Sequence, residues 1–149
     1  MKSISEELNT RFTNERHKAV VNVRHTSQFI GAYHEKQLKE FDISLPQFNI
    51  LRILRGAKEQ LSIKVIKERM LEKSPNTTRL IDKLITKKLV KRMRCKEDRR
   101  IVHVIITDHG LEMLENIDEV FNDIYLKMNL SEEEANQLNL LLDKMRNSA

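Results

Sequence analysis

The chain has 149 residues, of which 40% are hydrophobic and 33% charged, with three Gly, two Pro and one Cys. This size suits one domain with a sizeable core, with or without helical extensions, and the composition favours a mostly helical soluble fold over a β-sandwich or a disordered chain. One cysteine excludes an internal disulfide framework, and no apolar stretch approaches the roughly 20 residues that cross a bilayer.

The net charge of +5 is unevenly distributed along the chain. Between Lys73 and Arg100 there are eleven Lys and Arg residues against three Asp and Glu, a net of +8, so the other 121 residues sum to −3. Segregated positive charge favours a polyanionic partner, because it releases condensed counterions when it meets phosphates. The alternative is a solvated charged face, which more often carries interspersed acids.

The N-terminal part predicts a long amphipathic helix. Residues 14–40 contain one Gly and no Pro, and apolar side chains recur at helical spacing. Ile4, Leu8 and Phe12 have the same spacing, so the sequence leaves open whether the first residues extend this helix or fray. The segment MKSISEELNTRF has acids and polar residues where a secretory signal needs an apolar run, so we expect a cytoplasmic protein.

Shorter helices are predicted next. The first begins near Pro46, whose missing N–H is harmless in a first turn, and ends near Gly56. Ser62 is expected to cap the second, with one stray strand residue near Leu61 to Ser62. The segment SPNTTRLIDKLITKK predicts the third, with Ser74 as N-cap and Pro75 at the first helical position.

Two strands and two more helices complete the predicted order ααααββαα. Residues 89–95 and 101–107 are predicted to be two strands around the connection KEDRR, since Val102, Val104 and Ile106 alternate with His103 and Ile105, which indicates a β-hairpin. Thr107 or Asp108 can cap a helix of about 20 residues with three-and-four apolar spacing. The last helix opens with a capping-box pattern in LSEE.

Short helices followed by a hairpin match the winged helix-turn-helix plan. The major groove of B-DNA admits one α-helix, whose N-terminal residues reach the base edges. Asn76 can pair with adenine and Arg79 with guanine, whereas Thr77 can alternatively pack inward beside Leu80. Ser74 and the helix-terminal amides can bind a phosphate. The predicted DNA-binding residues of this helix are Ser74, Pro75, Asn76, Thr77, Thr78, Arg79 and Lys83.

The hairpin tip supplies a second set of candidate DNA contacts. Its cations repel one another unless they meet phosphates or a minor groove, whose negative potential attracts inserted Arg. Asp98 can orient Arg100 through a charge-assisted hydrogen bond. The predicted DNA-binding residues of the wing are Arg94, Lys96, Asp98, Arg99 and Arg100.

Three segments, LPQFNILRIL, TRLIDKLITKKLVKR and EDRRIVHVIITDHG, resemble the MarR-type (multiple antibiotic resistance regulator) family of transcription factors. The last contains the pattern DxRxxxV as Asp98, Arg100 and Val104. Lys88 departs from the family, which usually has Gly there, and a non-Gly residue at that turn requires a left-handed backbone or a shifted turn.

The resemblance implies a mainly α fold with a small β-hairpin wing. It implies a homodimer that binds double-stranded DNA at a pseudo-palindromic operator, usually as a repressor, and that responds to a small-molecule effector of unknown identity. The implied organisation is one domain, 1–149, in which 1–41 and 108–149 dimerise and 44–107 form the winged helix. Independently, the apolar stripes at 111–128 and 138–145 exceed what one small winged domain covers, which favours a partner helix surface over folding back.

Other kinds of site are weakly supported. The five histidines include no i,i+4 pair on one helix, so we expect no metal site, and no cofactor or catalytic motif is recognisable. We therefore expect a protein that is not an enzyme. Cys95 is expected to act as a small hydrophobe, although neighbouring basic residues could also lower its pKa and make it sensitive to oxidants.

Two other functions compete with DNA regulation. A winged-helix domain can serve as a protein-interaction adaptor that does not bind DNA, with its long helices recruiting partners. RNA binding is less favoured, because the deep groove of A-form RNA does not admit a recognition helix and residues 73–104 contain no stacking aromatic residue.

Overall fold

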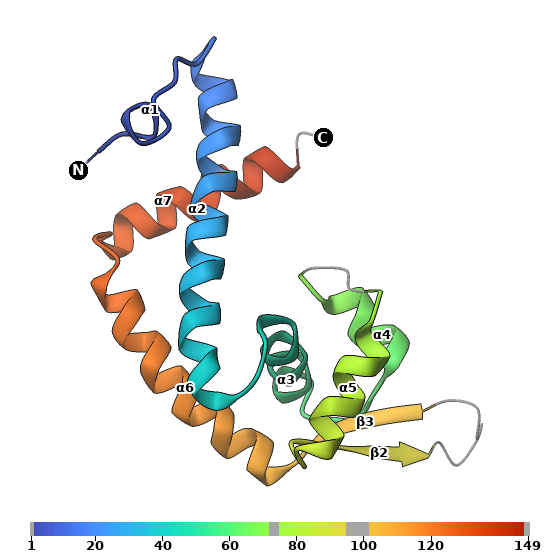
Figure 1. The fold of residues 1–149 in the computed structure, drawn as a ribbon. Coiled ribbons are helices and arrows are strands. Elements are labelled where there is room, and N and C mark those ends of the chain that lie inside the picture. The colour runs from blue at the N-terminus through green and yellow to red at the C-terminus, as the bar shows by residue number, and fades with distance from the viewer. Residues whose placement is uncertain (1, 72–74, 95–101, 148–149) are drawn as a thin grey trace. The chain divides into compact units, whose positions relative to one another are not determined.

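The computed structural model describes residues 2–71, 75–94 and 102–147, which Figure 1 traces from the N-terminus to the C-terminus. The chain divides into two compact units, residues 1–117 and 118–149. In chain order the described elements are α1 (Ile4–Glu7), α2 (Glu15–Leu38), η1 (Lys39–Phe41), α3 (Leu45–Ala57), β1 (Leu61–Ser62), α4 (Ile63–Arg69), α5 (Thr77–Thr86), β2 (Val90–Arg94), β3 (Val102–Ile106), α6 (Asp108–Lys127) and α7 (Glu132–Arg146). The predicted fold class, mainly α with a small β wing, is confirmed.

The predicted long helix is α2. Asn14 caps it, since the Asn14 side chain accepts a hydrogen bond from the backbone N–H of His17 at 2.9 Å. The first residues do not extend α2, because α1 is a separate turn closed by a capping box between Ser3 and Glu6. At the other end, the chain turns sharply at Asp42, whose φ is +53°.

Helices α3, α4 and α5 pack on one another and against the strands of the sheet (Figure 1). Ser44 caps α3 through a capping box with Gln47, and Ser62 caps α4 as predicted by accepting from Val65 N at 3.3 Å. The core contains side chains with no exposed surface from all three helices and from the sheet. They include Ile50, Leu51, Leu54, Ile66, Ile81, Leu84 and Val104.

The sheet in the described residues has three antiparallel strands in the order β1-β3-β2. Val104 at the centre of β3 lies opposite both Leu61 of β1 and Arg92 of β2. The hairpin of β2 and β3 was predicted. The strand expected before α4 is β1, which is the third strand of the sheet.

The first residues of α6 are tightly joined to the start of β2. The Thr107 hydroxyl accepts from Gly110 N at 3.1 Å and lies 2.7 Å from the carbonyl oxygen of Lys88, to which it donates. A Cβ on Gly110 would lie 2.3 Å from the carbonyl oxygen of Leu89, so only glycine fits at this approach. Of the two predicted caps for α6, the structure therefore uses Thr107.

The second unit, residues 118–149, includes α7. The predicted capping box is present: Ser131 Oγ accepts from Glu134 N at 3.2 Å, and Ser131 N donates to the Glu134 carboxylate at 2.8 Å. Hydrogen bonds that the carboxylate accepts from the Ser131 backbone and, secondarily, from its side chain lower the pKa of Glu134. None of the described residues of α7 is buried, and several of its leucines are largely exposed. Across the described residues, no helix is both long and apolar enough to cross a membrane.

Candidate nucleic-acid interface

The start of α5 presents most of the predicted helix contacts. Pro75, Asn76, Thr78 and Arg79 are exposed, as is Lys83 one turn further along. On the opposite side of this helix, side chains including Ile81 and Leu84 are fully buried. The helix is therefore amphipathic, with one face in the core and a polar, basic face open to solvent.

The predicted start of this helix was wrong. The helix begins at Thr77 rather than Pro75, and its first i→i+4 hydrogen bond runs from Leu80 N to Asn76 O at 3.0 Å. Asn76 takes the N-cap position with φ −101° and ψ 21°, without a side-chain capping bond. Pro75 consequently lies in the turn before the helix, and the predicted cap, Ser74, lies outside the described residues.

Thr77 differs from its neighbours because it is fully buried. Its hydroxyl lies 3.6 Å from Met70 Sδ, to which it donates a weak hydrogen bond. This contact joins the start of α5 to the end of α4. Of the two alternatives considered for Thr77, inward packing is the one observed, so its side chain positions the helix and cannot itself reach a base.

The end of α5 forms a left-handed helix terminus at Lys88. Its φ is +60°, so of the two alternatives considered for this turn, a left-handed backbone and a shifted turn, the left-handed backbone is the one observed. Lys88 N donates to Ile85 O at 2.9 Å and Leu89 N to Leu84 O at 3.0 Å, the two hydrogen bonds of a Schellman motif. Leu84 and Leu89 are both fully buried. This turn sends the chain directly from α5 into β2.

The described part of the wing consists of β2 and β3. Arg94 ends β2 opposite Val102, so the strand pairing reaches the base of the predicted tip. The tip residues Lys96, Asp98, Arg99 and Arg100 lie outside the described residues, as does Cys95. Their predicted contacts, including the Asp98–Arg100 pair, stay predictions.

An ion pair that the sequence analysis missed connects α5 to the wing. Asp82, on the exposed side of α5, accepts a hydrogen bond from the Arg92 guanidinium in β2. Both side chains are about half exposed, so the pair contributes modestly to stability and mainly restrains Arg92. Its only signal in the sequence was the spacing of ten residues around the tight turn at Lys88.

A second unpredicted ion pair holds the other end of α5. Lys87 Nζ lies 2.7 Å from a carboxylate oxygen of Asp42 and also donates to the Asp42 carbonyl. The hydrogen bond and the charge of Lys87 lower the pKa of the Asp42 carboxyl. The turn after α2 is thereby connected to α5.

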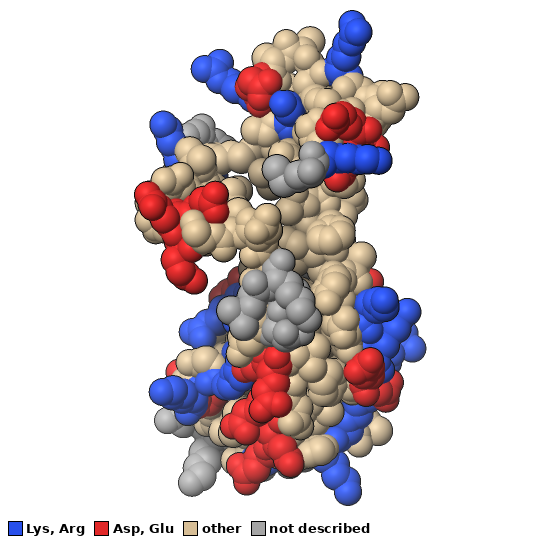
Figure 2. All heavy atoms as spheres, turned by 90° about the vertical axis from the view of Figure 1, so that its left-hand side faces the viewer, with Lys and Arg blue, Asp and Glu red and all other residues tan. Residues whose placement is uncertain are grey.

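The charge of the described residues is segregated between elements. From 75 to 94 the chain has seven Lys and Arg residues and one acid, Asp82. In contrast, the start of α6 exposes the acids Asp108, Glu112 and Glu115. In the view from the α6 side, Figure 2 shows acidic side chains gathered on the lower part of the molecule, with basic ones towards its margins. The basic surface therefore coincides with α5 and the wing.

A mostly apolar cavity of about 410 Å³ lies between α2 and α3. His34, Phe48 and Arg52 line it, and the Arg52 guanidinium lies 5.7 Å from the Phe48 ring centroid. Burial, and secondarily the charge of Arg52, lower the pKa of His34. No group of three potential metal-ligating side chains occurs among the residues that the structure describes.

Comparison with known proteins agrees with this geometry. A family model described as MarR family matches residues 43–102. The HTH-type transcriptional regulator SarZ of Staphylococcus aureus (strain USA300) is 29% identical over 122 residues, which cover 82% of this chain and 80% of SarZ.

Solved structures extend the similarity to nearly the whole chain. A MarR transcription factor from Planctomyces limnophilus is 32% identical, with a TM-score of 0.68 over 91% of this chain and 98% of its own. The S. aureus MepR–DNA complex is 26% identical, with a TM-score of 0.75 over 93% of this chain and 98% of its own.

The fold and the exposed basic helix define a winged helix-turn-helix protein of the kind that regulates transcription. The MarR family model matches this chain, and the match to the 32% identical transcription factor covers 98% of that protein. The chain therefore belongs to the MarR family.

Proposed function

We propose that this protein is a sequence-specific double-stranded DNA-binding regulator, which acts as a homodimer on a pseudo-palindromic operator in the cytoplasm. The observation that carries the proposal is the exposed N-terminal face of α5, with Asn76, Thr78 and Arg79 open to solvent at the centre of the basic segment. The MepR structure, a complex with DNA, supports the same role for this chain. No enzymatic step is part of the proposal.

In the proposed complex, α5 enters the major groove by its N-terminus. Asn76 and Arg79 have the side chains that pair bidentately with adenine and guanine, and the Thr78 methyl group can contact a thymine methyl group. Lys83 is one turn further along the exposed face and suits a phosphate contact. Thr77 is excluded from this set by its burial.

The wing is proposed to follow the adjacent backbone or minor groove. Strands β2 and β3 form a rigid base for the tip residues Lys96, Asp98, Arg99 and Arg100, whose charges favour that contact. Arg94 stands at the junction between this base and the tip. The Asp82–Arg92 pair supports the proposal because it ties the wing to the reading helix.

Homodimerisation and effector response are further parts of the proposal. Two copies would place two α5 helices on half-sites about one helical turn apart, roughly 10 bp centre to centre. Repression is the mode that we propose, since a dimer seated on an operator blocks access to it. The cavity lined by His34, Phe48 and Arg52 suits a small apolar anion, with the guanidinium as counter-charge.

The test is selection of bound duplexes from a random pool, followed by titration of the selected sequence. Replacing Arg79 with Ala should relax preference at one base pair per half-site and weaken binding by roughly 5- to 150-fold, the equivalent of about 1–3 kcal/mol. Arg24→Ala, which removes an exposed charge from α2, is the matched control and should leave base preference unchanged.

The competing function, a protein-interaction adaptor, makes the opposite prediction. Fluorescence anisotropy with random duplex at low salt would then show no binding. Retention of full affinity and unchanged preference in Arg79→Ala would equally reject α5 as the reading helix.

A further inference from the structure

Asp82 is the one acid of α5, and it lies on the exposed side of that helix. Residues 75–94 contain seven Lys and Arg residues and no other Asp or Glu. Thr78 and Arg79 precede Asp82 by four and three residues, so all three lie on the same face of the helix. A carboxylate on this face comes close to the phosphates of any duplex that α5 reads. Its charge weakens DNA binding unless a nearby cation compensates it.

Arg92 supplies that cation from the neighbouring strand. It lies opposite Val104 in the antiparallel register, and residues directly opposite each other project from the same face of a sheet. Val104 is fully buried, so Arg92 leaves β2 on the side that packs on the helices. Lys91 and Met93 alternate with it and project from the other face. Arg92 is thus directed towards α5, where its guanidinium donates to the Asp82 carboxylate.

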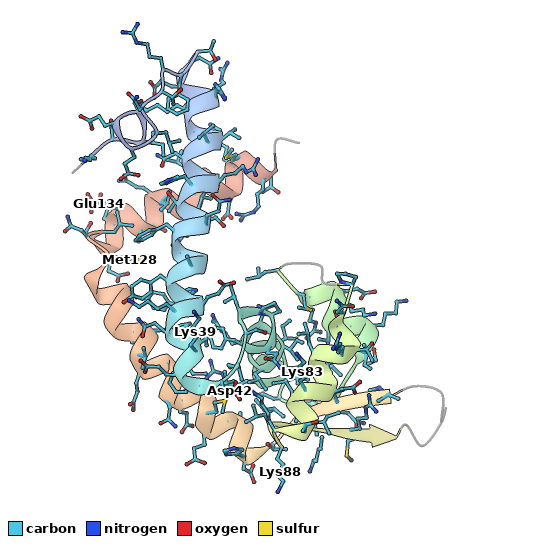
Figure 3. All side chains as sticks on the ribbon, viewed as in Figure 1. Lys39, Asp42, Lys83, Lys88, Met128 and Glu134 are labelled. Atoms are coloured by element: carbon cyan, nitrogen blue, oxygen red, sulfur yellow. The ribbon has the colours of Figure 1, made fainter. Side chains whose placement is uncertain are left out.

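The tight turn between α5 and β2 keeps the two side chains near each other. Figure 3 labels Lys83, which directly follows Asp82 on α5, and Lys88, where the chain turns towards β2. Two backbone hydrogen bonds hold that turn. The backbone is therefore ordered whether or not the ion pair forms, and pairing costs only the side-chain freedom of Asp82 and Arg92.

Both members of the pair remain accessible to other ions. The side chains of Arg92 and Asp82 are 48% and 51% exposed, so the pair is weak and Arg92 can exchange to another anion. A DNA phosphate is such an anion, and Arg binds it in the same forked geometry that it uses with a carboxylate. Asp82 and the phosphates of a bound duplex therefore compete for one guanidinium.

We propose that Asp82 determines specificity by withholding Arg92 from the phosphates of DNA outside the operator. Phosphate contacts add affinity without reading sequence, so each one strengthens binding to any duplex. On the operator, base contacts fix α5 and the ion pair fixes the wing beside it, so exchange of Arg92 to a phosphate sacrifices wing contacts. On random duplex no such contact is lost. The inference rests on the proposed function and adds to it a residue that lowers non-specific affinity.

The test is a salt titration of binding to random duplex and to the selected operator. Asp82→Asn removes the charge and keeps the size of the side chain. On random duplex, the plot of log affinity against log salt should steepen by about 0.9, the value of one additional phosphate contact, and the affinity at 0.1 M salt should rise roughly three- to eightfold. Affinity for the operator should rise less, so the ratio of the two affinities falls. A constant inactive fraction of protein does not alter the slope.

Two further variants identify the cation and separate its effect from net charge. Asp82→Asn combined with Arg92→Gln should return the slope to that of the parent protein, since no freed guanidinium remains. Glu115→Gln, which removes an exposed acid from α6, changes the net charge equally and should keep the parent slope.

An unchanged slope in Asp82→Asn, or a steeper slope that persists in the double variant, overturns the role of Asp82. An equal loss of affinity for both duplexes overturns it as well, since it indicates a structural role alone. In each of these cases, a parent protein that prefers the operator sustains the proposed function. A parent protein that does not prefer the operator over random duplex rejects the proposed function, and with it this inference.

Discussion

Lys88 shows how a single residue can adopt an unfavourable backbone conformation when the surrounding structure requires it. Its left-handed φ of +60° costs a residue with a Cβ roughly 1 kcal/mol relative to glycine. The turn is nevertheless kept, because its two Schellman hydrogen bonds and the buried pair Leu84 and Leu89 depend on it. The carbonyl of Lys88 also accepts from Thr107.

Replacing Lys88 with Gly should therefore stabilise the protein. The expected gain in the free energy of unfolding is about 0.5–1 kcal/mol, because the strain is relieved while every backbone hydrogen bond is kept. Urea unfolding of the purified variant measures it. Lys88→Ala is the control, since it removes the same charge but retains the Cβ; an equal gain in both variants would show that charge, not backbone strain, is responsible.

At the scale of elements, α5 is held at three points by its neighbours. Thr77 anchors its start to Met70, Lys87 anchors its end to Asp42, and Asp82 connects its exposed side to Arg92 in β2. A reading helix must have a defined orientation for base contacts to be selective. These three contacts fix the orientation of α5, and they require few polar groups to be buried.

The pair between Asp82 and Arg92 should show a small coupling energy. A double-mutant cycle of Asp82→Ala and Arg92→Ala is expected to give about 0.5 kcal/mol, because both side chains are about half exposed to solvent. The coupling should fall in 1 M NaCl, where the screening length is about 3 Å. A coupling above about 2 kcal/mol, or one insensitive to salt, would contradict the picture of an exposed restraint.

Elements were predictable where local chemistry determines them. The caps at Ser62 and Ser131, the helical periodicity of α2, α5 and α6, and the alternation in β3 are all local signals. The start of α5 was not, because burial of Thr77 against Met70 decides it, and that is a tertiary contact. The ion pairs at Asp42 and Asp82 were missed for the same reason: their partners are 45 and 10 residues away.

In the candidate site, too, features set by local sequence were predictable and features set by tertiary contacts were not. The sequence predicted the exposed set Asn76, Thr78, Arg79 and Lys83 from helical position alone. It singled out Thr77 as the residue that could instead pack inward but could not decide between the two alternatives, because it had no information on which neighbouring helix would cover that face.

At the scale of the whole molecule, the apolar side chains of α7 are notably exposed. No described residue of this helix is buried, and an isolated helix of 15 residues is only marginally stable in water. Leu138, Leu141 and Met145 recur at helical spacing and are each more than 40% exposed. A second copy of the chain is the partner that we propose for this stripe.

Replacing Leu141 with Glu should disrupt the proposed dimer, because it places a charge within an apolar interface. Light scattering coupled to size exclusion should then give a mass near the 17.6 kDa of one chain, and affinity for a two-half-site duplex should fall steeply. Gln137→Glu adds the same charge to an exposed polar position of α7 and should remain dimeric. If both variants keep twice the chain mass, α7 does not form the interface.

The shortness of α5 has a mechanical consequence. A ten-residue helix is less than three turns long, so it has too little length to bend and moves as a stiff rod. Any tilt imposed at Lys83 or Lys87 is transmitted undiminished to Asn76 and Arg79. A displacement at the C-terminal end of α5 therefore moves the residues at its N-terminal end without a relay of intermediate side chains.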